Sequence, residues 1–275
     1  MFIRSSSDVS TRGSHSVNEH ELTKFAKISN EWWDPHGAFK YLHTMNAPRI
    51  RFIRDTLVDL SRQNVKEQRG VDLTGLRAVD VGCGGGLAAE SLARLGLRVL
   101  GIDAARENVE IARLHQTKDL ALAGSDALEY RQITAEQLLA DTSNRGNFDA
   151  VVSLEVIEHV TDPFTFVRSL VELARPGAPI IVSTMNRTPI SYLVDIAVPE
   201  YLTRMVPRGT HEHGKFIKPE ELRLMLRACG AEMLDVRGLV LDPVTNVCHL
   251  VDRDLGLLRD VGVQANYIMA ARKNK

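Results

Sequence analysis

The chain has 275 residues, of which 44% are hydrophobic and 25% charged, and its formal net charge is −1. This composition is typical of a globular α/β protein, and the near-neutral charge gives no electrostatic case for a nucleic-acid partner. Three cysteines without a C-x-x-C pair argue against a disulfide framework or a zinc–thiolate site, and no apolar run approaches the roughly 20 residues that span a bilayer.

The N-terminal stretch is rich in serine and arginine and holds one acid, Asp8, before Glu19. Residues 1–17 are therefore expected to be a disordered tail or the remnant of an organelle transit peptide. Residues 18–275 are expected to form a single domain. From Asn18 apolar residues recur at three- and four-residue spacing, which predicts a helical cap over residues 18–60.

Two adjacent tryptophans, Trp32 and Trp33, stand in this cap beside an Asp-Pro turn. The commoner role of such aromatics is to pack on the sheet. On the helix that follows, Arg49 carries a guanidinium suited to bidentate binding of a ligand carboxylate.

Residues 77–103 predict one βαβ unit with a glycine turn, a frequent setting for a nucleotide-like ligand at a helix N-terminus. The apolar stretch up to Val81 is a buried strand, and Gly82 and Gly84 open the turn. A second strand ends at Asp103. The G-x-G-x-x-G spacing of dinucleotide-binding proteins fails from Gly82, whereas counting from Gly84 gives G-x-G-x-x-A and leaves a nicotinamide or flavin cofactor as a weak alternative.

The acid before the turn favours another ligand. Asp80 would repel a pyrophosphate but could face a cationic group, and S-adenosylmethionine carries an ammonium and a sulfonium without any phosphate. Asp103 would then accept hydrogen bonds from both ribose hydroxyls. The turn together with the strand-end acid resembles the class I S-adenosylmethionine-dependent methyltransferases. The alternative is that Asp80 and Asp103 only cap the turn and the next helix.

A second informative stretch follows the apolar run of residues 148–154, which predicts a central parallel strand. Glu155, Glu158 and His159 come directly after it, where open α/β sheets bind ligands. The three side chains could hold Mg²⁺, although imidazole is an unusual ligand for that ion. Alternatively His159 is a general base, since histidine is suited to removing a phenolic proton at neutral pH.

A strongly apolar, roughly helical excursion follows the next strand. The segment 187–215 is expected to be a lid over an apolar substrate, an interfacial helix on a membrane, or a helix packed on the core. A last strand near residues 266–271 follows a hairpin-like region and is expected to be antiparallel to the rest.

Several stretches are similar to the ubiquinone-biosynthesis O-methyltransferase family, and together they cover nearly everything from Leu22 onward. They are EWWDPHGAFKYLHTMNAPR, VDVGCGGG, GID, SLEVIEHV, STMNRT, EYLTRMVPRGTHEHGKFIKPEEL, DPVTN and NYIMAARK. The resemblance implies a class I methyltransferase Rossmann-like sheet of about seven strands, mostly parallel with the last antiparallel. Helices cover both faces, with an N-terminal helical cap and a helical insertion after the fifth strand.

The resemblance also implies a reaction and a place for it. The expected reaction is methylation of the hydroxyls of a polyprenylated dihydroxybenzene ring, with His159 and Glu155 as the catalytic candidates. The resemblance implies contacts to S-adenosylmethionine from Arg49, Gly82, Asp103 and Leu154, and a Mg²⁺ site formed by Glu155, Glu158 and His159. The turn itself adds Asp80 and Gly84 to the expected cofactor contacts. The insertion is expected to contact membrane lipid.

The expected location is the matrix side of the mitochondrial inner membrane, as a peripheral protein and in a complex with other ubiquinone-biosynthesis proteins. A membrane-associated protein of the bacterial cytoplasm is the alternative. Two other functions stay open, namely methylation of a different small phenolic acceptor and a non-catalytic cofactor-binding module of a lipid-biosynthetic complex.

Overall fold

The computed structural model describes residues 16–26, 29–64, 71–193, 212–242, 245–251 and 263–275. Its strands are β1 (Arg77–Val81), β2 (Arg98–Asp103), β3 (Leu128–Gln132), β4 (Ala150–Leu154), β5 (Pro179–Met185), β6 (Ala231–Asp242), β7 (Val247–Val251) and β8 (Asn266–Lys273). Its helices include α1 (Glu19–Ala26), α2 (Lys40–Asn64), α3 (Leu87–Arg94), α4 (Arg106–Gln116), α5 (Ala135–Ala140), α6 (Pro163–Leu173), α7 (Pro189–Ser191) and α8 (Pro219–Ala228).

All eight strands form one sheet in the order β3-β2-β1-β4-β5-β8-β6-β7. The first five strands pair in parallel, while β8 runs antiparallel between β5 and β6, and β7 pairs antiparallel with β6. The expected Rossmann-like sheet with an antiparallel last strand is thus confirmed. The hairpin strand β7 is an addition to the seven strands that the sequence predicts.

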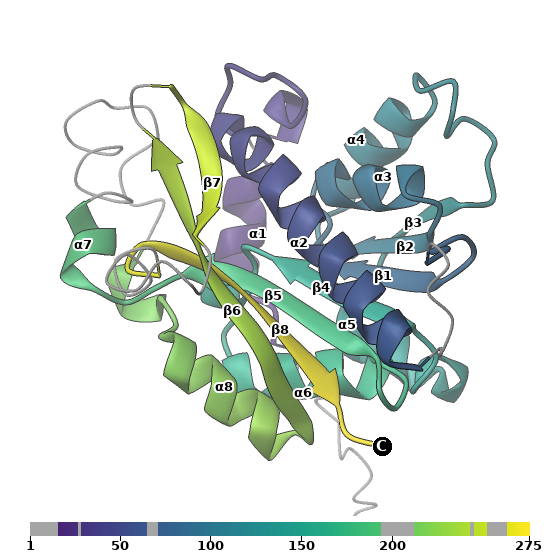
Figure 1. Cartoon of the computed structure of the whole chain (residues 1–275). Helices are drawn as coiled ribbons and strands as arrows, with labels where there is room; N and C mark the ends of the chain where they lie inside the picture. Colours follow the sequence, from purple (N-terminus) through teal and green to yellow (C-terminus); the bar gives the residue numbers. More distant parts are fainter. Residues whose placement is uncertain (1–15, 27–28, 65–70, 194–211, 243–244, 252–262) are drawn as a thin grey trace, which may run out of the picture.

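Helices cover both faces of this sheet (Figure 1). One apolar core contains Leu138, Leu170 and Leu222 of α5, α6 and α8, and the other contains Ile53 of α2 and Leu92 of α3. The central strands β4 and β5 are buried on both faces and are accordingly apolar up to their last residues, which is why they lack the alternating pattern of a half-exposed strand. Figure 1 shows α2 running diagonally across the sheet.

Local signals set the ends of several helices where the sequence places them. Asp162 caps α6 by accepting a hydrogen bond from the Thr165 N–H, and Pro163 occupies the first turn. Thr134 and Gln137 form a capping box at the start of α5. Helix α2 continues to Asn64, beyond residue 60 at which the helical cap was expected to end.

The two ends of the expected domain organisation are described only in part. Ser16 is buried and packs against the domain, so the docked chain includes the end of the segment expected to be a tail. Of the insertion at residues 187–215, residues 194–211 lie outside the described part. The division into a tail and a single domain stays a prediction. Among the described residues, no helix is both long and apolar enough to cross a membrane.

Candidate active site

The glycine turn between β1 and α3 forms the floor of the site. Gly82, Gly84 and Gly86 have φ angles of +77°, +53° and +93°, a left-handed conformation that side chains with a Cβ seldom adopt. The N–H of Gly82 donates to the Ile102 carbonyl at 2.8 Å, and the N–H of Gly84 donates to the Asp103 carboxylate at 2.9 Å. Asp103 is thereby tied to the turn from the end of the neighbouring strand.

Trp32 of the N-terminal cap lies directly on this turn. A Cβ at Gly84 would stand 2.3 Å from the Trp32 ring, and one at Gly85 would stand 2.5 Å from it. The ring stacks on Phe39 with 3.8 Å between centroids, and its indole N–H donates to Asn108 at 2.9 Å. The expectation that the cap aromatics pack on the sheet is therefore wrong for Trp32, which packs on the turn. Its ring fits there only because residues 84 and 85 are glycines.

Replacing Gly84 with alanine should destabilise the protein more than the same change at Gly177. Both residues have positive φ, +53° and +82°, so each alanine adds strain of about 1–2 kcal/mol. Only Gly84 has a neighbour in the way, and displacing Trp32 should add about 1–3 kcal/mol. Chemical denaturation of the two variants measures the difference. Equal losses would show that Trp32 does not press on the turn.

A narrow cavity of about 30 Å³ adjoins the turn and collects most of the predicted cofactor residues. Its lining includes Arg49, Asp80, Gly82 and Leu154, together with Trp32. Two buried polar atoms here, Arg49 Nε and Asp80 Oδ2, have no hydrogen-bond partner among the residues that the structure describes. Burial raises the pKa of Asp80 to about 7, although the Arg49 charge opposes that shift. A cation and an acid with unused hydrogen-bonding capacity thus face one small space.

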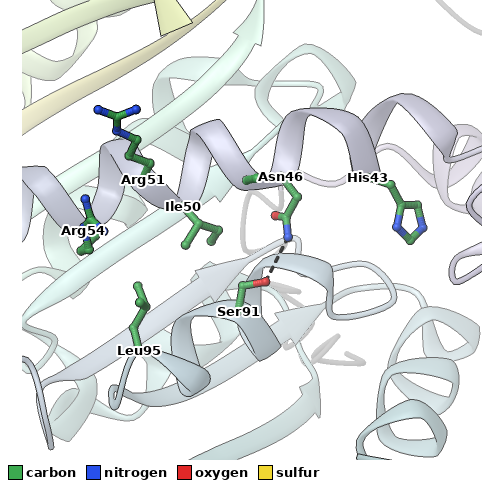
Figure 2. Close-up of a pocket in the computed structure, with 8 residues that line it drawn as sticks. His43, Asn46, Ile50, Arg51, Arg54, Ser91 and Leu95 are labelled. Atoms are coloured by element: carbon green, nitrogen blue, oxygen red, sulfur yellow. Dashed lines mark hydrogen bonds between the residues drawn. The ribbon is translucent and has the colours of Figure 1, made fainter. Parts of the chain in front are cut away.

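The cavity has room for only about one water molecule, so a nucleotide-sized ligand enters it only when Trp32 and its neighbours move. A wider cavity of about 400 Å³ opens elsewhere on α2, toward α3 (Figure 2). None of the predicted site residues lines it. Asn46 at its wall donates to Ser91 Oγ at 3.0 Å, which holds α2 against α3 and so fixes the helix that carries Arg49.

Asp103 is already engaged by the protein on both carboxylate oxygens. Oδ1 accepts from the Ala105 N–H at 2.8 Å and from Asn108 at 3.2 Å, while Oδ2 accepts from Gly84. Burial raises the pKa of Asp103 above its ordinary value, and these hydrogen bonds offset part of that increase. Asp103 therefore caps the turn and holds the residue that precedes α4, while α4 itself has no side-chain cap. Oδ1 already accepts two hydrogen bonds, whereas Oδ2 accepts one and keeps a second lone pair for a ligand hydroxyl.

The corner after β4 holds the two predicted acids in separate environments. Glu155 has a φ of +57°, an uncommon conformation for a residue with a side chain. Its carboxylate accepts from Ser183 at 2.6 Å and lies 3.7 Å from the Arg49 guanidinium. Glu158 is buried and accepts from Thr184 at 2.8 Å. Burial raises the pKa of Glu158 to about 7, and the charge of Glu155 adds to the shift.

His159 ends the short turn η3 (Ile157–His159) and faces the N-terminal helix. Its Nδ1 lies 3.0 Å from a carboxylate oxygen of Glu21, which comes from α1, 138 residues earlier in the chain. Both side chains are mostly buried. Figure 1 shows α1, in purple, close to the end of β4.

The expected Mg²⁺ site finds no support in this arrangement. Glu155, Glu158 and His159 each hold a different protein partner, and no group of three acid, histidine or cysteine side chains in the described part of the chain is placed to bind a metal ion. The donor set therefore does not fit the ion as expected. The site in this form consists of one histidine, two separated acids and a buried guanidinium.

Four residues of the site were not singled out from the sequence as site residues: Glu21, Trp32, Ser183 and Thr184. Ser183 and Thr184 are fully buried at the end of β5, and the pairing of Leu154 with Ser183 sets them beside the β4 corner. The signal for them was polar residues at the end of a buried strand. No comparable local signal marks Glu21, because its partner is distant in sequence.

Sequence comparison relates the chain to methyltransferases. A family model described as a methyltransferase domain matches residues 45–236. A Dinoroseobacter shibae protein named ubiquinone biosynthesis O-methyltransferase is 39% identical over 95% of this chain and 98% of its own length. An Arabidopsis thaliana protein with the same name, described as mitochondrial, is 41% identical over 97% of this chain and 77% of its own length.

Solved structures share the fold at lower identity. Magnesium protoporphyrin IX methyltransferase from Synechocystis, with bound SAH, has a TM-score of 0.54 and 17% identity, covering 95% of this chain and 90% of its own. A SAM-dependent methyltransferase from Aquifex aeolicus has a TM-score of 0.53 and 14% identity, covering 91% and 97%. Both comparisons show a shared fold.

Proposed function

The chain belongs to the ubiquinone biosynthesis O-methyltransferase family, and on this premise we propose that it methylates ring hydroxyls of polyprenylated dihydroxybenzoate and demethyl-ubiquinol. It is an S-adenosylmethionine-dependent O-methyltransferase of ubiquinone biosynthesis.

One observation carries the proposal: the cavity lined by the candidate cofactor residues reaches the end of β4, and the candidate base lies in the turn that follows this strand. Leu154 lines the narrow cavity, and the next residue, Glu155, lies 3.7 Å from the Arg49 that lines it too. His159 follows within one short turn. A donor held at the turn would therefore lie next to an acceptor held at the corner.

The unpartnered groups of the cavity fit the methionine end of S-adenosylmethionine. We assign the ligand carboxylate to Arg49 and the ligand ammonium to Asp80, whose free Nε and Oδ2 atoms are otherwise buried without partners. Asp103 is assigned to the ribose hydroxyls, and Gly82 and Gly84 to close backbone approach. Trp32 must leave the turn for this ligand to enter, so the cap opens before binding.

The mechanism needs no covalent intermediate with the protein. When bound, S-adenosylmethionine supplies a methyl group on a positively charged sulfur. His159 takes the proton of a catechol hydroxyl at Nε2, and the oxygen then attacks the methyl carbon in line with the departing sulfur. Glu155 holds Arg49 and lies beside the reacting groups. We assign no step to Mg²⁺, because its three candidate ligands hold other partners.

Acceptor chemistry tests this proposal. Purified protein and S-adenosylmethionine are incubated with a short-prenyl dihydroxybenzoate, the same ring without its prenyl chain, and a prenylated ring whose hydroxyls are already methylated. We expect product with the first, less with the second because the apolar contact is lost, and none with the third. Equal turnover of the first two would favour a different small phenolic acceptor. Bound cofactor without any product would favour a non-catalytic module.

The prenyl tail of the acceptor supports a membrane surface as the place of action. Ile190, Tyr192 and Leu193 are 45%, 49% and 57% exposed at the start of the insertion, as an apolar membrane-contacting segment would require. The mitochondrial inner membrane, matrix side, stays a prediction that the Arabidopsis relative supports, and bacterial relatives support the cytoplasmic alternative. Assembly with other ubiquinone-biosynthesis proteins also stays a prediction.

A further inference from the structure

The N-terminal helix α1 contributes a carboxylate to the catalytic corner. Glu21 is 6% exposed and its Oε2 lies 3.0 Å from His159 Nδ1. A buried carboxylate usually has a charged or hydrogen-bonding partner, since removing its charge from water costs several kcal/mol. The burial and the distance indicate that Glu21 is placed to meet His159.

Contacts ahead of α1 hold Glu21 in place. The carbonyl of Ser16 accepts from the Thr161 N–H at 2.7 Å and from the Thr161 hydroxyl at 2.9 Å. The Ser16 hydroxyl donates to Glu136 at 2.6 Å. Thr161 lies two residues after His159, so one end of α1 is tied to the same turn that carries the histidine.

We propose that Glu21 is a positioning residue that fixes the tautomer and the ring orientation of His159. When Glu21 accepts a hydrogen bond from Nδ1–H, the proton of the neutral ring is on Nδ1 and Nε2 is unprotonated, which is the form a base needs. Carboxylates serve this purpose for catalytic histidines in other enzymes. The backbone of His159 is held as well, because its N–H donates to the Val156 carbonyl at 2.9 Å.

This inference rests on the proposed function only for its effect on turnover, because the tautomer is a property of the free protein. It makes the N-terminal cap part of the catalytic machinery, in addition to packing on the glycine turn. Residues 18–60 then act at both halves of the site, with Trp32 at the donor side and Glu21 at the acceptor side.

The test compares Glu21→Ala, Glu21→Gln and Glu21→Asp with Glu19→Gln, a matched change at an exposed acid of the same helix. Glu21→Ala should lower kcat by at least about 10- to 100-fold, the loss seen when the carboxylate partner of a metal-bound histidine is removed; the catalytic triad aspartate contributes up to about 10⁴-fold. The KM for S-adenosylmethionine should stay within about twofold of the wild-type value. Glu21→Asp should restore part of kcat, and Glu19→Gln should behave as wild type.

Long-range ¹H–¹⁵N spectra of histidine-labelled protein read the tautomer directly at one fixed pH. Wild type should show His159 protonated at Nδ1, and Glu21→Ala should lose that preference. In a His159→Ala background, Glu21→Ala should cause no further loss of kcat, because the two residues act as a unit. An unchanged tautomer in Glu21→Ala, or an equal loss of kcat and cofactor binding, would overturn the assignment.

Failure of the broader proposal gives a different pattern. If the wild-type protein methylates no prenylated catechol, the acceptor is wrong, while the Nδ1 tautomer and its dependence on Glu21 still stand or fall in the spectra. If the wild type is active and the Glu21 variants match it in both readouts, only the positioning role is wrong.

Discussion

Replacing His159 with alanine should lower kcat by about 10²- to 10⁴-fold while the Kd for S-adenosylmethionine stays within about twofold, because general base catalysis contributes this much and the cofactor binds elsewhere. His159 lies at the β4 corner, whereas the groups assigned to the methionine moiety, Arg49 and Asp80, line the cavity at the turn. Stopped-flow or steady-state rates give kcat, and calorimetry gives the Kd.

Two further variants separate base chemistry from packing. His159→Gln keeps an N–H that can donate to Glu21 but offers no atom of comparable basicity, so it should be nearly as slow as the alanine variant. His249→Ala removes an exposed histidine from β7 and should leave kcat unchanged. If His159→Gln regained most of the activity, or if kcat and cofactor affinity fell together, His159 would not be the base.

Replacing Asp80 with asparagine should weaken S-adenosylmethionine binding about 10- to 100-fold. A hydrogen bond to a charged group contributes about 1.5–3 kcal/mol, and the neutral amide loses most of it. Asp80 Oδ2 is buried without a partner, so the ligand ammonium would satisfy it. Titration calorimetry measures the Kd, with Asp126→Asn at an exposed acid as the matched control. An unchanged Kd in Asp80→Asn would remove this residue from the cofactor site.

The same carboxyl makes cofactor binding depend on pH. Burial raises the pKa of Asp80 from 3.8 to about 7, with Arg49 lowering it and Asp103 raising it. Below pH 7 the free protein holds this proton, so the Kd should rise by up to about tenfold per pH unit as the pH falls. The stability of the ligand-free protein changes in the opposite sense. The Asp80 contribution to the free energy of unfolding should decline as the pH rises from about 4 to about 7, because the unfolded chain has lost the proton that the folded chain retains. Asp80→Asn should flatten the pH dependence of the Kd and reduce that of the stability, to which Glu158 contributes in the same direction because burial raises its pKa to about 7 as well.

The donor half of the site could be predicted from the sequence because it depends on short-range features. The glycine turn, Asp80 before it and Asp103 after the next strand lie within one βαβ unit, whose geometry follows from the strand and helix patterns. Arg49 was placed by its helix. Asp80, Gly82 and Leu154 line one cavity because β1 pairs in parallel with β4, whereas Asp103 bonds to the turn from β2 and does not line it.

The acceptor half was less accessible because it depends on contacts between distant segments. Glu155, Glu158 and His159 lie within five residues, and their composition suggested one metal site. The left-handed backbone of Glu155 and the turn η3 direct them instead to Ser183, Thr184 and Glu21. No local pattern reveals that α1 packs on this corner, nor that Trp32 covers the glycine turn rather than the sheet.

The central claim is that this chain transfers a methyl group from S-adenosylmethionine to a ring oxygen of a prenylated catechol. The most direct measurement uses S-adenosylmethionine with a deuterated methyl group, a short-prenyl dihydroxybenzoate and mass spectrometry of the product. The account predicts one CD₃ group per product, bound to a ring oxygen and absent with His159→Ala. Label on carbon, or no label despite measurable cofactor binding, would contradict it.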